Sequence, residues 1–244
     1  MEALWIPNDF LSWPIFCEAS SSVDIHILNR AYEIWEHAKT LIEQGQNSFS
    51  MSDGILNLKR CLNQRIRAIK ALYPIDKIEF PGKPKGDFEL FEFYGLAKPF
   101  LLRNLLDIRN AIEHSDAPPP SWERCRELLD IVWYFLKSTD GLVRSVKTDF
   151  YFEEYFESPY SIIFEMDYQP HRPFAFWGWF PADQVFREYA ASRVPINAHS
   201  VRTAEQLSNK FQKNRLDTDL CIDGFFKMDG LLYSRIIKRC FNAY

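Results

Sequence analysis

The chain has 244 residues, of which 47% are hydrophobic and 16% aromatic, so it can bury a core and is not disordered. Its formal net charge of −4 excludes a globally basic nucleic-acid binder, so any nucleic-acid site needs a local positive patch. No stretch approaches the roughly 20 apolar residues that cross a membrane, and the five cysteines lack C-x-x-C spacing. We therefore expect a cytoplasmic protein with reduced thiols and no membrane association.

The first part of the chain is predicted to be helical after an irregular segment that ends near Ser22. Apolar residues recur at helical spacing in four stretches that are bounded by capping or helix-breaking residues. The expected helices cover residues 23–44, 54–72, 88–114 and 121–138. Pro99 should bend the third helix, since proline removes a backbone donor. Four helices joined in this way predict an antiparallel four-helix bundle.

The sequence pattern changes near residue 146, where short stretches rich in aromatic and β-branched residues begin. Three strands are expected, at residues 150–156, 161–168 and 173–180. Two or three helices should follow, at about residues 181–191, 203–213 and 229–241. We therefore predict a mainly α protein, with a helical domain over residues 1–145 and a small α+β domain over residues 146–244.

The third expected strand contains an unusually aromatic sequence, FAFWGWF, at residues 174–180. Aromatic residues at alternating positions are typical of a sheet buried in a core. Two other interpretations stay open: a stacking platform for RNA bases or a nucleotide, and a sensor surface for a phage-derived trigger.

The second expected helix is basic although the whole chain is acidic. Its cations include Lys59, Arg60, Arg65 and Arg67, and no acidic residue follows Asp53 within this helix. Such a helix is a candidate surface for contacts with an RNA backbone. The alternative is a solvated face that pairs with the acidic first helix.

The third expected helix has two faces of different chemistry. At about 100° per residue, one narrow stripe is apolar. It comprises Leu101, Leu105, Ile108 and Ile112. The opposite face carries polar residues spaced four, three and four apart, namely Arg103, Asp107, Asn110 and His114. Arg109 lies at the flank of the apolar stripe, so guanidinium, amide and imidazole groups gather near the end of one helix.

These groups suit the cleavage of RNA. The RNA 2′-OH is itself the nucleophile, so the protein needs only to move protons and to stabilise charge on phosphorus. His114 can transfer protons near neutral pH, and Arg109 can bind a phosphate with its forked guanidinium. Asn110 can hold the imidazole or a phosphate oxygen, and Arg103 is a weaker candidate for RNA contact. No spacing of metal ligands occurs, so we expect neither a metal nor another cofactor.

The sequence IRNAIEH at residues 108–114 resembles the HEPN superfamily. In that family an R-polar-x-x-x-H motif at the end of the third main helix forms the ribonuclease site of a dimer. The resemblance covers residues 24–140 and implies that Arg109 and His114 are catalytic, with Asn110 as the supporting polar residue. It also implies a homodimer that cuts RNA without metal and leaves 2′,3′-cyclic phosphate ends.

Many HEPN proteins are toxins or antiviral abortive-infection effectors, so the resemblance implies an antitoxin or a phage-derived trigger as a partner. In the branch that AMPylation silences, a Tyr stands two residues after the His. Asp116 occupies that position here, which argues against this form of control. The alternative function is a catalytically silent HEPN-like module that binds RNA, a nucleotide or a protein. An ordinary helix end, with Arg103 paired to Asp107, is the structural alternative.

Overall fold

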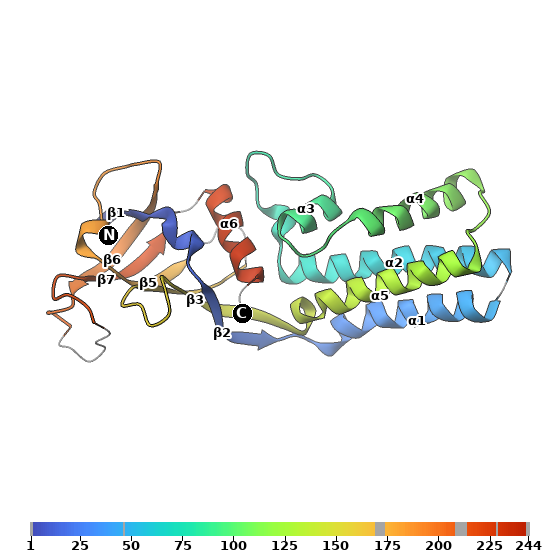
Figure 1. Cartoon of the computed structure of the whole chain (residues 1–244), viewed down its shortest axis with the longest axis horizontal. Helices are drawn as coiled ribbons and strands as arrows, with labels where there is room; N and C mark the ends of the chain where they lie inside the picture. Colours follow the sequence, from blue (N-terminus) through green and yellow to red (C-terminus); the bar gives the residue numbers. More distant parts are fainter. Residues whose placement is uncertain (1, 46, 169–173, 208–213, 228, 243–244) are drawn as a thin grey trace. The chain divides into compact units, whose positions relative to one another are not determined.

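The computed structural model describes residues 2–45, 47–168, 174–207, 214–227 and 229–242 (Figure 1). The chain divides into two compact units. The helical unit comprises Ser22–Asp76 and Pro84–Val146. The sheet unit comprises Met1–Ser21, Lys77–Lys83 and Lys147–Tyr244, so its sheet takes strands from both ends of the chain.

The fold class is α+β, and the expectation of a mainly α protein built on a four-helix bundle is wrong. Helices account for 50% of the chain and strands for 23%, and the described strands form one seven-stranded antiparallel sheet. Residues expected to be irregular form strands β1 (Glu2–Pro7) and β2 (Ile15–Ser22). Strands β6 (Arg193–Thr203) and β7 (Leu220–Phe226) were also not expected.

Among the residues that the structure describes, two expected helices of the sheet unit are not found. Only a short 3-10 turn, Ala182–Gln184, lies within the expected helix at residues 181–191. The expected helix at residues 203–213 starts where β6 ends, and residues 208–213 lie outside the described part of the chain. Local periodicity did not predict the strands of this part of the chain, because their hydrogen-bond partners are distant in sequence. For example, Trp5 of β1 pairs with Pro195 of β6.

The remaining predictions for the sheet unit are confirmed in type, with shorter or shifted bounds. The three expected strands are β3 (Ser145–Glu153), β4 (Ser161–Glu165) and β5 (Ala175–Phe180), and the last expected helix is α6 (Gly230–Phe241). The strand order is β1-β6-β7-β5-β4-β3-β2. The register of β6 against β7 shifts between Ala198 and Ser200.

Aromatic side chains build the core of the sheet unit. Phe10 lies against Phe152 and Phe226, with ring centroids 5.5 Å apart in each pair, and Phe226 lies 4.5 Å from Phe176. On α6, Tyr233 stacks on Phe174 at 4.8 Å. The aromatic sequence at residues 174–180 belongs to this core, because its buried members include Phe174, Phe176, Trp179 and Phe180. The buried-sheet interpretation is therefore confirmed, and these four rings are not available as a stacking platform.

The helical unit contains α1 (Ile25–Gly45), α2 (Ser48–Leu72), α3 (Asp87–Phe93), α4 (Phe100–Ser115) and α5 (Trp122–Arg144). Side-chain caps start two of them: Asn47 accepts a hydrogen bond from the Ser50 amide, and Ser121 accepts one from the Arg124 amide. The third expected helix is broken into α3 and α4. Gly95 adopts a φ of +76° and Pro99 follows, which together end one helix before the next begins.

Helices α1, α2 and α5 pack against one another, and α4 lies against α2 and α5 (Figure 1). Leu102 and Leu105 are the buried residues of α4. The predicted apolar stripe is only partly covered: Leu105 is fully buried, but Leu101 is 50% exposed. Each described helix is too short or too polar to span a lipid bilayer.

Candidate functional site

The R-polar-x-x-x-H motif, Arg109 to His114, lies at the C-terminal end of α4, where the sequence predicts a polar face. Asn110 and His114 are both exposed, and 68% of the His114 side chain is accessible. Asp116 ends the helix with a φ of 50°, in the left-handed region that aspartate tolerates better than most residues. The Asp116 amide donates to the Ala111 carbonyl, which fixes the chain just beyond His114.

Arg109 is the best-anchored group of the motif. Its guanidinium forms an ion pair with Glu113, one helical turn further on, and donates a 3.0 Å hydrogen bond to the Asn110 side-chain oxygen. The imidazole Nε2 of His114 lies 3.6 Å from the same Glu113 carboxylate. Glu113 therefore stands between the two groups to which the sequence assigns catalysis, and a phosphate would compete with it for Arg109.

Arg109 and Glu113 line a pocket of about 370 Å³ between α1, α2 and α4. The cations that line this pocket are Arg30, Lys59, Arg60, Arg67 and Arg109, and the acid that lines it is Glu113. The structure thus brings together Arg109 and three of the four predicted RNA contacts on the basic helix. His114 does not line the pocket but stands one residue beyond Glu113.

The pocket is electrostatically suited to an anion. Within the described part of the chain, no ion pair joins Lys59, Arg60 or Arg67 to an acidic side chain, which argues against pairing with the acidic first helix. Lys59 donates a 2.6 Å hydrogen bond to the neutral side chain of Asn63. Burial lowers the pKa of Lys59, and the charges of Arg109 and Arg67 lower it further, whereas Asp87 acts in the opposite sense. A bound phosphate would relieve this repulsion between like charges.

Arg65 has a different place from the one the sequence suggested. It was expected to contact RNA, but its side chain is fully buried. The Nη1 atom donates to the Asp140 carboxylate at 2.9 Å and to the Leu136 carbonyl at 3.2 Å. Arg65 therefore belongs to the interior of the helical unit and cannot reach a ligand at its surface. Its spacing of five and two residues from Arg60 and Arg67 turns it toward α5.

Arg103, the weaker candidate, also points elsewhere. Its guanidinium lies 2.7 Å from the Glu89 carboxylate of α3, and Arg103 does not line the pocket. The expected pair with Asp107 is not the one formed. Since both side chains of the Arg103–Glu89 pair are about half exposed, this ion pair adds little stability.

Two charged residues of the pocket were not predicted from the sequence. Arg30 of α1 lines it from the opposite wall, where it also pairs with Glu33 at 2.7 Å. Glu113 was not among the predicted site residues. Arg30 precedes Ile34 by one helical turn, and both line the pocket. That spacing places Arg30 beside the core, but no local pattern reveals which helix it faces.

No group of three or more His, Cys, Asp and Glu side chains placed to hold a metal ion occurs among the described residues. Comparison with known proteins gave no match: no family model, no curated protein and no solved structure is significantly similar to this chain. The function is therefore argued from the geometry and chemistry of this pocket and of the end of α4.

Proposed function

We propose that the helical unit is a metal-independent endoribonuclease of the HEPN type. The observation that carries the proposal is the convergence of five cations on one pocket, with Arg109 among them and His114 next to its rim. RNA presents a row of phosphates, and guanidinium and ammonium groups bind them. The titratable imidazole supplies the proton transfer that phosphate binding alone does not.

The reaction assigned to the site is attack by the RNA 2′-oxygen on the adjacent phosphorus. The 2′-O–P bond forms and the P–O5′ bond breaks, which leaves a 2′,3′-cyclic phosphate and a 5′-OH end. A histidine removes the 2′-OH proton, and a second protonated group delivers a proton to the departing O5′. Arg109 stabilises the negative charge that builds on phosphorus, and Asn110 orients the Arg109 guanidinium.

The active form proposed here is a homodimer, because one chain offers only one His114 at the site while the reaction uses an acid and a base. An exposed apolar side chain of α4 supports this arrangement. Phe100 is 72% exposed, and at about 100° per residue it lies near the face of α4 that carries Asn110 and His114, so a second copy of α4 packed on this face would remove apolar surface from water. A two-fold axis along this face would bring two copies of Arg109 and His114 together.

We assign the activity to the cytoplasm, where the free thiols of the described cysteines stay reduced. A metal-independent ribonuclease in that compartment acts on the cell's own RNA, so its role would be that of a toxin or an antiviral defence effector. Such a role requires restraint, and an antitoxin or a phage-derived trigger protein is the proposed partner.

The direct test is cleavage of total and transfer RNA by the purified chain in excess chelator. We expect cleavage to persist, with 2′,3′-cyclic phosphate ends identified by mass spectrometry. His114→Ala should abolish it, and His37→Ala is the matched control because His37 is an exposed histidine of α1 that does not line the pocket. Activity that vanishes in chelator and returns with Mg²⁺ or Mn²⁺ would refute the metal-independent mechanism.

The dimer is tested by mixing wild-type chains with His114→Ala chains after the mass in solution has been measured by light scattering. If each active site uses two chains, total activity falls faster than the wild-type fraction. A linear fall, or full activity of a monomer, contradicts the shared site.

One observation favours a second candidate function, a catalytically silent module that binds RNA. Glu113 already engages Arg109, so the motif as it stands is closed by an internal ion pair. The two functions separate in one experiment: the silent module binds RNA tightly in a Glu113→Gln variant without cutting it, whereas the ribonuclease cuts it.

A further inference from the structure

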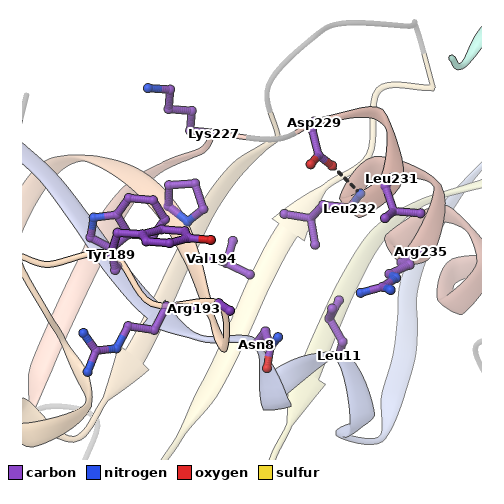
Figure 2. A pocket seen from close by; sticks show the side chains of 13 residues that line it. Asn8, Leu11, Tyr189, Arg193, Val194, Lys227, Asp229, Leu231, Leu232 and Arg235 are labelled. Atoms are coloured by element: carbon purple, nitrogen blue, oxygen red, sulfur yellow. Dashed lines mark hydrogen bonds between the residues drawn. The ribbon is translucent and has the colours of Figure 1, made fainter. Parts of the chain in front are cut away.

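A second pocket lies within the sheet unit, between the start of β6, the end of β1 and the first turns of α6. Its volume is about 480 Å³, within the roughly 300–1,000 Å³ typical of small-molecule sites. Figure 2 shows Leu231, Leu232 and Arg235 of α6 facing Tyr189 and Val194 across this pocket. Offsets of three and four residues place both leucines on the same helix face as Arg235.

One wall of this second pocket is aromatic and open to solvent. Trp5 lies edge-on to Tyr189, with ring centroids 5.2 Å apart. Tyr189 is 73% exposed, in contrast to the buried rings of the core. Trp5 also pairs with Phe186 through two backbone hydrogen bonds, of 2.8 and 2.9 Å, so β1 and the segment carrying Tyr189 are held together. The wall is thus fixed at its base and exposes ring surface to a ligand.

The remaining charged groups of this pocket favour an anion. Arg193, Lys227 and Arg235 line it, and Asp229 is the acid among the lining residues. The Asp229 carboxylate accepts a 2.8 Å hydrogen bond from the Leu232 amide and caps α6, where the helix dipole offsets its charge. Arg193 lies 3.3 Å from the Phe186 ring centroid and donates to the Glu188 carbonyl, so it holds the segment that carries Tyr189. Among the described residues, no hydrogen bond or ion pair engages the charged ends of Lys227 and Arg235.

We infer that the second pocket binds a nucleotide. Its base stacks on Tyr189 beside Trp5, its sugar lies over the leucines of α6, and its phosphate meets Arg235 and Lys227. Base stacking on aromatic rings together with cations for the phosphate is how proteins hold single nucleotides with little sequence preference. A purely apolar ligand would form no ion pair with Lys227 and Arg235, and a free phosphate would not stack on the aromatic rings. The inference does not depend on ribonuclease activity, because this pocket lies in the other unit.

The test is equilibrium binding to the full chain, measured by isothermal titration calorimetry with four probes: AMP, UMP, adenosine and inorganic phosphate. We expect both nucleotides to bind, and adenosine and phosphate each to bind at least about 10-fold more weakly, since each satisfies only one wall. Tyr189→Ala and Arg235→Gln should each weaken AMP binding about 10-fold. Both side chains are exposed, so folding should survive, which circular dichroism checks.

Matched controls use residues of the same type outside the pocket. Tyr155→Ala replaces an exposed tyrosine of the sheet unit, and Arg202→Gln replaces an exposed arginine of β6, so neither should change AMP affinity. Arg109→Gln separates this site from the basic pocket of the helical unit: the part of AMP binding that Tyr189→Ala weakens should persist in Arg109→Gln. Phosphate binding as tight as AMP binding, or AMP binding that Tyr189→Ala and Arg235→Gln do not weaken, would overturn the inference.

Discussion

Helix α2 carries arginines of the same chemistry into two opposite surroundings. On one face, Arg65 is fully buried and pairs with Asp140 of α5. On the other face, Arg60 and Arg67 are exposed and line an anion-ready pocket with Arg109 of α4. A run of cations in a sequence is therefore not one feature, because a helix that turns about 100° per residue directs Arg65 away from Arg60 and Arg67.

Substitutions that remove charge from the two faces of α2 are expected to have different effects. Charge lost from the buried face should cost stability, because an unpaired ion in an apolar interior is poorly solvated. Charge lost from the open face, which carries Lys59, Arg60 and Arg67, should lower the affinity for RNA and hardly change stability, because water replaces the missing contact.

The largest effect is expected from Asp140→Ala, which leaves the buried Arg65 guanidinium without its carboxylate. The free energy of unfolding should fall by about 3–5 kcal/mol, as measured by urea denaturation. Asp130→Ala, at an exposed aspartate of the same helix, should change it by less than about 0.5 kcal/mol. The double variant Arg65→Met with Asp140→Leu should recover most of the loss, since an apolar pair needs no compensation. Equal effects of Asp140→Ala and Asp130→Ala would break the contrast between the faces.

Across the pocket from the open face, Arg109→Ala should lower the rate of RNA cleavage about 100-fold or more, the scale of one charge stabiliser in a transition state. The midpoint of urea unfolding should hardly move, because the Arg109 side chain is partly exposed and pairs only at the surface. Arg103→Ala is the matched control, for which we expect a much smaller loss. A variant that unfolds yet keeps its specific activity would remove Arg109 from the site.

Replacing the open-face cations singly, as Lys59→Gln, Arg60→Gln and Arg67→Gln, should weaken RNA binding several-fold each. Every replacement should also reduce the slope of log affinity against log salt by about one, because one phosphate contact is lost. Fluorescence anisotropy over a range of salt concentrations measures both quantities. Lys98→Gln, at a cation that is 91% exposed and lies outside the pocket, should leave the slope unchanged. A slope that no substitution alters would return this face to ordinary solvated surface.

The smallest effect is an increase. Glu113→Gln removes the carboxylate that competes with phosphate for Arg109, so RNA affinity should rise about twofold to fivefold, the scale of one partly exposed ion pair. The same anisotropy assay measures it, and Glu127→Gln, at an exposed glutamate of α5 outside the pocket, is the control. A loss of affinity in Glu113→Gln would mean that the ion pair positions Arg109 rather than blocking it.

Local sequence patterns predicted the features that depend on near neighbours. The apolar spacing of α1, α2 and α5 follows from a helix that repeats every 3.6 residues, and caps such as Ser121 mark where a helix begins. The polar face of α4 was predicted for the same reason, and Asn110 and His114 are exposed as expected. The aromatic sequence of β5 was predicted as a buried strand because its side chains alternate.

Tertiary structure decided everything that depends on distant partners. Strands β1 and β2 have no local reason to form, since each lies beside a strand far along the chain, β6 for β1 and β3 for β2. The same holds for charge. Spacing along α2 could not show that Arg65 is buried and Arg67 exposed, because only the packing of α5 determines which face of α2 is shielded from water. Contacts between helices also decide that Arg30 lines the pocket and that Arg103 pairs with Glu89 instead. A sequence determines the periodicity of one element, but burial is a property of two elements in contact, and burial decides whether an arginine stabilises the fold or binds a ligand.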